Sequence, residues 1–430
     1  MKFLDVRNGA GRGQLEKLFQ RKVYTQEIED SVAKILNEIR KNGDSAVSKF
    51  AGKFDHVRIK PADFKIKDSE FDMAEKFVPS SLQKHIRFAV KNVKQFAMRQ
   101  IPKSWIFSPR KGVTMGEKFT PMDRVGVYIP GGAAPLVSTA IHTAAVAKIA
   151  GVKEIVAVTP PSKAGINPAL LFAMKTAGVT EAYRLGGVYA IAALAYGTKT
   201  VKRVEKIVGP GNAYVTAAKK LVYGTTGIDM AAGPSEIMII ADSTADPSFI
   251  AADLLSQAEH GSGYEQAVLL STDIKIAKIA ADEVINRARD LKMSESFKNV
   301  LSKGIFVVVV KDLESAAEIA GQYAPEHLEI LCKNPDNLAK KLSSAGAIFI
   351  GHWTPEAAGD YVAGPSHVLP TGSTARFFSG LSAEHFFRRS SIIKYSESAL
   401  RREASAIIAI ADTEGLRAHK LSVAVRCGRA

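Results

Sequence analysis

The chain has 430 residues, of which 46% are hydrophobic and 23% charged, and these globular proportions exclude a disordered or fibrous protein. Its two cysteines lack metal-binding spacing, which excludes a disulfide framework and a cysteine-based metal site. The formal charge of +15 would suit nucleic acid, but lysine and arginine are spread along the chain without a basic run, so we expect no nucleic acid and instead small anions such as a dinucleotide.

The N-terminal part of the chain predicts an arm followed by helices. Residues 1–24 form the expected arm. Thr25 then precedes apolar residues at helical spacing, and Gly43 follows the last turn, where a left-handed cap is commonly needed. A further helix is expected around residues 81–100.

An uncharged stretch at residues 125–147 is long enough to span a bilayer. Its prolines, glycines and histidine are instead typical of a buried strand, a turn and a helix. The N-terminus also lacks an apolar signal segment. We therefore expect a soluble, cytoplasmic protein that makes no contact with a membrane.

From residue 125 onward, strand-like segments alternate with helical ones. The first run extends to residue 223, and within it Asn167 and Pro168 offer a helix cap and a proline at the first helical position. A second run begins at Glu236 and extends to residue 350. This alternation predicts an α/β fold with two Rossmann-like parallel-sheet domains. After about residue 381 the pattern is helical and basic, which indicates a C-terminal appendage.

Four glycine-rich turns follow strand-like segments, at residues 130–132, 186–187, 209–211 and 233–235. Each could bring backbone amides close to a phosphate at a helix N-terminus. Taken alone, each is more typical of a plain connection between a strand and a helix, because none has the full G-x-G-x-x-G spacing. Together they favour a ligand cleft at the ends of the strands.

Gln257 and His260 lie three residues apart at the end of a predicted helix, so their side chains share one face. A histidine with an oxygen ligand at this spacing suits zinc. A single histidine near a helix end is, however, more often a capping or surface residue.

Glu326 and His327 follow Pro325 in a predicted turn, which could aim both side chains into one cleft for acid–base chemistry. The alternative is two ordinary turn residues. Cys332 lies inside an apolar strand pattern, and a buried cysteine is usually inert, so a thiol nucleophile is disfavoured.

Residues 351–372 form a loop dense in glycine and proline, and a polar loop of this kind is often functional. Within it, Asp360 could be a metal ligand, whereas His352 and His367 are interpreted as structural. Further along, Glu414 and His419 would point about 140° apart on one helix. They converge only if Glu414 precedes the helix, which Gly415 allows.

These segments together resemble histidinol dehydrogenase, in that family's order and over essentially the whole chain. The motifs are VGVYIPGG, GPGNAYVTAAKK, DMAAGPSE, SQAEHG, APEHLEI, GHxTPExxGDY with its SHVLPTG continuation, and EGLxAH. The resemblance implies the last step of histidine biosynthesis, the oxidation of L-histidinol to L-histidine through the aldehyde with two NAD molecules and one zinc ion per subunit.

The resemblance also implies roles for individual residues. The zinc ligands would be Gln257, His260, Asp360 and His419, and the catalytic bases would be Glu326 and His327. The substrate contacts would be Ser235, Gln257, His260, His327, Asp360, Glu414 and His419. The NAD contacts would be Tyr128, Asn212 and the position of Tyr189, where the family usually has glutamine. Ser366 stands where the family often has asparagine.

The chemistry implied is consistent with these residue types. A neutral His327 can take the alcohol proton, and Glu326 can activate the water that must add to the aldehyde before a second oxidation. Zinc would orient the imidazole and amino groups of the substrate, and Glu414 could pair with its ammonium.

The family's architecture implies an intertwined homodimer whose active site is completed by the partner subunit. The expected parts are an N-terminal arm (1–24), a discontinuous first α/β domain (25–129 and 237–381), a second, NAD-binding α/β domain (130–236) and a C-terminal dimerisation segment (382–430). The alternative is a sibling dehydrogenase of the same scaffold that oxidises another polar alcohol, such as a sulfonated diol. Tyr189 keeps that alternative open, whereas Glu414 and His419 favour histidinol.

Overall fold

The computed structural model describes residues 1–430 except 9–11, 20, 22–24, 132–134, 292–293 and 429–430. The predicted turn at residues 130–132 thus lies partly outside the described residues. The chain forms two compact units: Met1–Gln100 with Asp123–His385, and Ile101–Met122 with Phe386–Ala430. Within the described ranges, no helix is long and apolar enough to cross a membrane.

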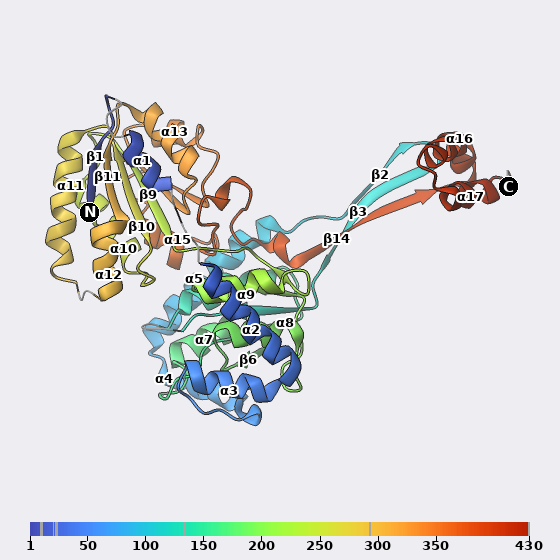
Figure 1. The fold of residues 1–430 in the computed structure, drawn as a ribbon, viewed down its shortest axis with the longest axis horizontal. Helices are drawn as coiled ribbons and strands as arrows, with labels where there is room; N and C mark the ends of the chain where they lie inside the picture. Colours follow the sequence, from blue (N-terminus) through green and yellow to red (C-terminus); the bar gives the residue numbers. More distant parts are fainter. Residues whose placement is uncertain (9–11, 20, 22–24, 132–134, 292–293, 429–430) are drawn as a thin grey trace. The chain divides into compact units, whose positions relative to one another are not determined.

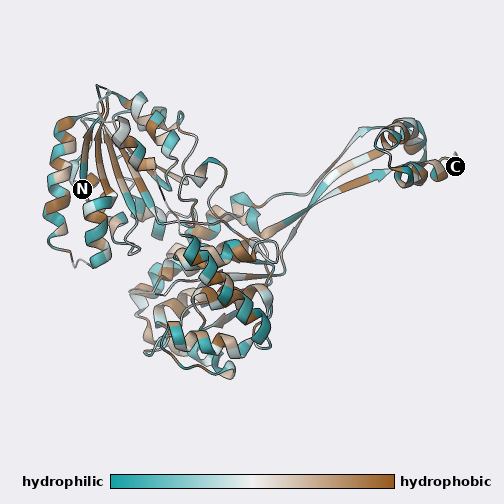
Figure 2. Ribbon diagram, in the orientation of Figure 1, coloured by the Kyte–Doolittle hydropathy of each residue, from teal (hydrophilic) through white to brown (hydrophobic). Residues whose placement is uncertain are grey.

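The first unit contains a parallel six-stranded sheet in the order β1-β11-β10-β9-β12-β13 (Figure 1). Its strands are β1 (Lys2–Asp5), β9 (Glu236–Ala241), β10 (Gln266–Ser271), β11 (Ile305–Val309), β12 (His327–Leu331) and β13 (Ala347–Ile350). Their hydrophobic colouring in Figure 2 is the pattern of a parallel sheet buried on both faces.

Helices cover both faces of this sheet. One face packs on α10 (Pro247–Ala258), α11 (Ile274–Ala288) and the short α12 (Glu295–Asn299), and the other on α1 (Arg12–Phe19), α13 (Leu313–Tyr323) and α14 (Pro335–Ala339). Along β9, Ile237 and Ile239 enter the first core, whereas Met238 and Ile240 enter the second. Side chains that alternate along a strand must divide between the faces in this way.

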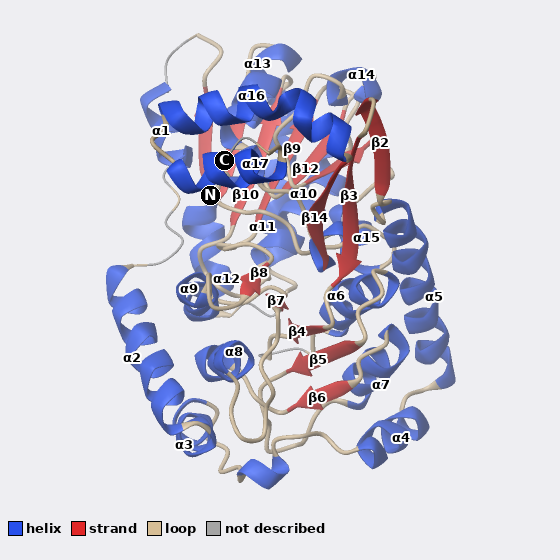
Figure 3. Cartoon of the chain, turned by 90° about the vertical axis from the view of Figure 1, so that its right-hand side faces the viewer, coloured by secondary structure: helices blue, strands red, loops and turns tan. Residues whose placement is uncertain are grey.

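A second parallel sheet of the first unit has the order β6-β5-β4-β7-β8. Its strands are β4 (Arg124–Tyr128), β5 (Glu154–Val158), β6 (Glu181–Tyr183), β7 (Lys206–Val208) and β8 (Gly227–Ile228). One core joins it to α2 (Gln26–Asn42), α3 (Asp44–Phe54), α8 (Gly187–Tyr196) and α9 (Ala213–Val222). The opposite face carries α6 (Val137–Ile149) and α7 (Pro168–Ala177), backed by α4 (Asp68–Phe77) and α5 (Ser80–Ala97) (Figure 3).

The five-stranded sheet begins in the middle, extends to one side and then returns to the other, and the six-stranded sheet does the same from β9 onward, with β1 added at its edge. The reversal lies between β4 and β7 in the five-stranded sheet and between β9 and β12 in the six-stranded sheet. Ligands of open α/β sheets usually bind beside such a reversal, at the carboxyl ends of the strands. The predicted α/β class with parallel sheets is confirmed.

The packing of residues 26–100 and 123–128 differs from the predicted domain boundaries. Strand β4 pairs with β5 and β7, and α2 and α3 share the core of the five-stranded sheet, so these residues pack with residues 154–228. Apolar periodicity shows that a helix has a buried face but not which sheet covers it. Residues 2–5, expected in an arm, form the edge strand β1. The remaining boundaries stay predictions.

Local signals in the sequence predicted several element ends correctly. Thr25 occupies the N-cap position of α2, without a side-chain hydrogen bond, and Gly43 after the helix has φ 53°. The Asn167 side chain accepts a hydrogen bond from the Ala169 N–H at the start of α7, and Gly178 after that helix has the left-handed φ of 107°. Positive φ values of this size favour glycine because it has no Cβ.

The second unit is an antiparallel sheet in the order β14-β3-β2 followed by two helices. Its elements are β2 (Trp105–Arg110), β3 (Val113–Pro121), β14 (Phe387–Tyr395), α16 (Glu397–Thr413) and α17 (Arg417–Arg426). The helical C-terminal segment is therefore present, but it begins with an unpredicted strand, β14. That strand pairs with a segment about 270 residues away, and local pattern carries little information about such a partner.

Candidate active site

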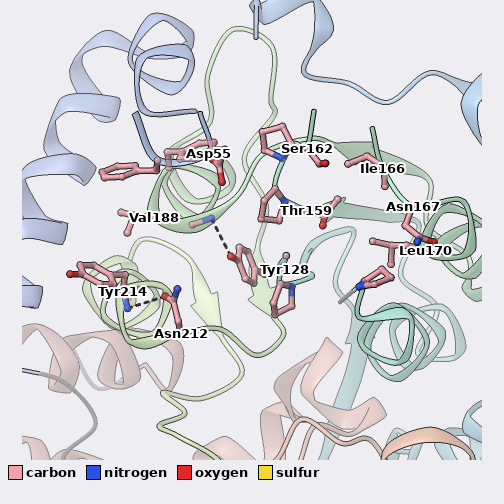
Figure 4. A pocket seen from close by; sticks show the side chains of 18 of the residues that line it. Asp55, Tyr128, Thr159, Ser162, Ile166, Asn167, Leu170, Val188, Asn212 and Tyr214 are labelled. Atoms are coloured by element: carbon pink, nitrogen blue, oxygen red, sulfur yellow. Dashed lines mark hydrogen bonds between the residues drawn. The ribbon is translucent and has the colours of Figure 1, made fainter. Parts of the chain in front are cut away.

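A pocket of about 1010 Å³ lies at the carboxyl edge of the five-stranded sheet (Figure 4). Its lining includes residues that follow β4, β5, β6 and β7, among them Tyr128, Thr159, Gly187 and Asn212. The N-terminal ends of α7, α8 and α9 contribute to it, so the positive ends of three helix dipoles lie at the pocket and favour an anionic group such as a phosphate. The volume and position suit a dinucleotide.

Tyr128 and Asn212 hold the turns that line this pocket. The Tyr128 hydroxyl accepts a hydrogen bond from the Gly187 N–H at 3.1 Å, and burial raises the pKa of Tyr128 to about 12. The Asn212 side chain caps α9 by accepting hydrogen bonds from the N–H groups of Tyr214 and Val215, each at 3.1 Å. Both predicted contact residues therefore lie at the pocket, one buried and one exposed.

Tyr189 also lines the pocket, but its hydroxyl is engaged within the protein. It is buried on α8 and donates a hydrogen bond to the carboxylate of Asp55, which follows α3. Burial and the Asp55 carboxylate raise the pKa of Tyr189, so the phenol keeps its proton. Asp55 was not predicted from the sequence, because its place beside α8 depends on how α3 packs.

A second group of polar residues gathers at the amino edge of the six-stranded sheet, near the reversal between β9 and β12. Glu326 and His327 lie at the start of β12, and Gln257 and His260 lie at and just beyond the end of α10. The group also includes Glu356 and Asp360, from the short helix α15 (Glu356–Tyr361). All of these except His260 are buried or half-buried.

The hydrogen bonds of His327 define the state of its imidazole. Nδ1 lies 3.1 Å from the backbone carbonyl of Glu236 and 3.2 Å from Oε1 of Gln257, and both atoms are acceptors. Nδ1 therefore carries the hydrogen, and the lone pair is on Nε2. Nε2 is buried without a hydrogen-bond partner among the described residues and lies 3.8 Å from Glu356 and 3.9 Å from Asp360. Burial lowers the pKa of His327, which keeps the ring neutral.

Glu326 lies beside His327, and the backbone of Glu236 forms a hydrogen bond with each of them. Its Oε2 accepts a hydrogen bond from the Glu236 N–H at 3.0 Å and lies 3.9 Å from Nδ1 of His327. Burial is the main reason that the pKa of Glu326 is raised well above its usual range, and the nearby carboxylates add to it. Glu236 thus orients both predicted bases, one through its N–H and one through its carbonyl.

His260, Glu356 and Asp360 bring three potential ligand atoms within 4.8 Å of one another. Burial and the neighbouring Glu356 raise the pKa of Asp360 to about 8. The ion-pair partners of both acids among the described residues are histidines, and Glu356 Oε1 is buried without a hydrogen bond. A divalent cation would offset this unbalanced charge, and a set of histidine nitrogen and carboxylate oxygen suits zinc.

Gln257 lies next to the group of His260, Glu356 and Asp360, because its side-chain nitrogen is 3.2 Å from Nδ1 of His260. Three of the four predicted ligands, Gln257, His260 and Asp360, are therefore gathered in one place. Glu356 was part of the polar loop noted in the sequence but was given no role. Its spacing of four residues before Asp360 on a helix was the signal that could have identified it.

A pair of stacked histidines adjoins the acids. The rings of His142 and His367 stack with centroids 4.6 Å apart, and Nδ1 of His367 lies 3.9 Å from Asp360. His142 belongs to α6, so a helix of the five-stranded sheet reaches the polar group of the six-stranded sheet.

Ser235 immediately precedes β9 and is half-buried there. Cys332 is buried, and burial raises the pKa of its thiol, which agrees with an inert role.

Glu414 and His419 belong to the second unit. Glu414 ends α16, outside α17, and His419 lies on α17; both side chains are exposed. Glu414 therefore does precede the helix that carries His419. Their assignment to the active site stays a prediction.

The sequence profile of histidinol dehydrogenase matches residues 19–427. Histidinol dehydrogenase from Carboxydothermus hydrogenoformans is 45% identical over 96% of this chain and 97% of that protein. The enzyme of the same name from Geobacter metallireducens is 43% identical over 99% and 98%. The crystal structure of histidinol dehydrogenase from Elizabethkingia anophelis superimposes with a TM-score of 0.92 at 35% identity, over 99% of this chain and 98% of that one. The chain therefore belongs to the histidinol dehydrogenase family.

Proposed function

We propose that the protein oxidises L-histidinol to L-histidine through the aldehyde, with two molecules of NAD and one zinc ion per subunit. One observation carries this proposal. Nε2 of His327 is buried without a hydrogen-bond partner among the described residues, and it lies near Glu356 and Asp360, two of the potential metal ligands. A neutral imidazole with a free lone pair is the base that alcohol oxidation needs. The family membership supports the choice of substrate.

The proposed zinc ligands are Gln257, His260 and Asp360, with His419 supplied by a partner subunit. The three from the first unit adjoin one another, and the buried charge of Glu356 and Asp360 has no lysine or arginine ion-pair partner among the described residues. Zinc, when bound, supplies a Lewis acid that fixes the imidazole and amino groups of the substrate. Glu356 is an alternative oxygen ligand from the same helix.

The pocket of the five-stranded sheet is the proposed NAD site, with Tyr128 and Asn212 as contacts and Tyr189 in its wall. Bound NAD supplies the hydride acceptor for each oxidation. The positive ends of the helix dipoles around the pocket favour the negatively charged pyrophosphate. The stacked His142 and His367 support a link between this pocket and the acid group, because they join α6 to Asp360.

His327 is the proposed base of the first oxidation. Its Nε2 takes the hydroxyl proton of histidinol while the carbinol C–H bond breaks and its electron pair leaves as hydride. The hydrogen bond from Nδ1 to the Glu236 carbonyl stabilises the imidazolium that forms. This division of roles between the two ring nitrogens fixes the direction of proton transfer.

Glu326 is the proposed base of the second oxidation. An aldehyde has no hydroxyl hydrogen to lose, so a water molecule must first add to its carbonyl carbon. The Glu326 carboxylate takes a proton from that water, and the resulting hydrate offers a C–H bond for the second hydride loss. Its hydrogen bond from the Glu236 N–H holds it beside His327.

The remaining substrate contacts are proposed to include Ser235 and, from a partner subunit, Glu414 and His419. Exposed apolar residues on β2 and β14 support a homodimer through the second unit. They are Trp105, Ile106, Phe107 and Ile393. Strands this apolar are rarely left in water, because they invite pairing or aggregation.

The test is a count of NADH formed per L-histidinol consumed, with purified protein, excess NAD and added zinc. We expect two NADH per substrate, loss of activity on treatment with a chelator and recovery on addition of zinc. A folded, zinc-loaded dimer that forms no NADH would contradict the proposal. It would favour the sibling activity on another polar alcohol, for which the same assay with a sulfonated diol is the direct measurement.

A further inference from the structure

Asp55 is the only charged side chain among the described residues that line the pocket of the five-stranded sheet. The other lining residues are apolar, glycine, proline, hydroxyl or amide residues, with no lysine, arginine or histidine among them. Figure 4 shows Asp55 at the same pocket as Tyr128 and Asn212. A ligand group that meets Asp55 must therefore accommodate a carboxylate without a compensating cation.

Tyr189 fixes the orientation of this carboxylate. The buried phenol donates its hydrogen bond to Oδ2 of Asp55, whereas Oδ1 has no hydrogen-bond partner among the described residues. The backbone of Asp55 follows α3, and its N–H is bonded to the Ala51 carbonyl. One oxygen is thus held by the protein, and the carboxylate keeps acceptor capacity for a ligand.

The ribose of a dinucleotide offers the complementary chemistry. Its vicinal hydroxyls are two donors, and a carboxylate can accept hydrogen bonds from them, as an acidic residue does in Rossmann-type dinucleotide sites. A 2′-phosphate offers only acceptors and brings negative charge to the same point, where the pocket has no cation to pair with it. We propose that Asp55, positioned by Tyr189, accepts hydrogen bonds from the adenosine ribose and selects NAD over NADP. This inference rests on the proposed dinucleotide site.

The inference also accounts for tyrosine at position 189. An amide at this point could contact a dinucleotide directly, whereas the Tyr189 hydroxyl acts through Asp55. Tyr189 is therefore a positioning residue, and Asp55 is the residue that meets the ligand.

The experiment compares the binding of NADH and NADPH to the zinc-loaded full-length protein by fluorescence titration. We expect the wild type to bind NADH at least about 100-fold more tightly than NADPH. Asp55→Asn should reduce this ratio at least about tenfold, through weaker NADH binding and stronger NADPH binding. Tyr189→Phe should reduce it about threefold, because the carboxylate remains but is no longer fixed. Asp63→Asn, which removes the same charge from an exposed position outside the pocket, should leave the ratio unchanged.

An unchanged ratio in Asp55→Asn would overturn the inference. If that variant does not fold, Asp55→Ser decides the question by the same ratio. Failure of this inference can be told apart from failure of the proposed function. If the proposed function is wrong, the wild type forms no NADH from histidinol. A wild type that forms two NADH, together with variants that keep its selectivity, contradicts the role of Asp55 alone.

Discussion

At position 327, one ring nitrogen is engaged by the protein and the other is free to accept a proton. Replacement by alanine removes the base without removing a proposed zinc ligand. We expect His327→Ala to lower the rate of the first hydride transfer by about 10²–10⁴-fold. Rapid-mixing measurement of NADH formation checks this, with zinc content measured in parallel. His85→Ala, an exposed histidine of α5, is the control, and wild-type turnover by the alanine variant at 327 would remove His327 from its role.

Glu326 and His327 both form a hydrogen bond with the backbone of Glu236, but they are assigned to different steps. Glu326→Gln keeps the shape and the hydrogen bond from the Glu236 N–H but cannot take a proton from water. We expect it to slow the oxidation of the aldehyde at least about 100-fold while the alcohol step changes less than about fivefold. Single-turnover assays started from histidinol and from its aldehyde separate the two steps. Equal slowing of both would contradict the division of roles.

At the residue scale, the sequence identified side chains whose neighbours in the chain are also neighbours in space. Glu326 with His327 and Gln257 with His260 are of this kind, and the structure gathers both pairs at one edge of a sheet. Asp55 could not be found in this way. Its partner Tyr189 lies 134 residues further along the chain, and their contact depends on the packing of α3 against α8.

At the element scale, β12 connects the active-site group to a second set of acids. Glu329 lies two residues after His327 and is fully buried. Its Oε1 accepts a hydrogen bond from the Glu356 N–H at 2.7 Å and so fixes the start of α15. Its other oxygen is buried without a hydrogen-bond partner among the described residues, and burial together with the Asp253 carboxylate of α10 raises the pKa of Glu329 well above its usual range.

Burial raises the pKa of Asp253 to about 6. An acid whose pKa is raised on folding contributes stability below its ordinary pKa, near 4, and loses that contribution as the pH rises to about 6. Asp253→Asn removes this loss. We expect the free energy of unfolding of the variant, relative to wild type, to rise by about 2 kcal/mol between pH 4 and pH 7.

Urea midpoints measured across this pH range check the prediction. Asp282→Asn, at an exposed site on α11, is the matched control and should show no such rise. A difference between Asp253→Asn and wild type that stays constant with pH would contradict a raised pKa of Asp253 in the folded protein.

The type and the ends of each helix or strand could be predicted from interactions between residues close in the sequence. Which elements pair or pack with one another could not. The cap at Asn167 and the glycine at 178 act within a few residues, so they were visible in the sequence. The pairing of β14 with β3 and the packing of α2 on the five-stranded sheet join segments far apart in the chain. Their hydrophobic patterns fit more than one partner, and only the assembled core selects one.

At the scale of the whole molecule, the second unit differs from the first in having little core. Leu421 and Val425 on α17, Ile410 on α16 and Ile393 on β14 are all more than half exposed. Exposed apolar side chains in such number support the proposed homodimer through this unit. His419 lies on the same helix α17, so a partner that covers this unit would also meet the proposed zinc ligand.

A shared active site makes a specific prediction for mixed dimers. His327→Ala and His419→Ala should each be inactive, the second because it loses zinc. In a dimer with one subunit of each kind, one site carries both substitutions and the other carries neither. If His419 serves the partner's site, unfolding and refolding an equal mixture should restore about a quarter of wild-type activity, since about half of the dimers are mixed and each has one intact site. If His419 serves its own subunit, every site keeps one substitution and no activity returns. Recovery of activity in the mixture therefore measures which subunit supplies the fourth ligand.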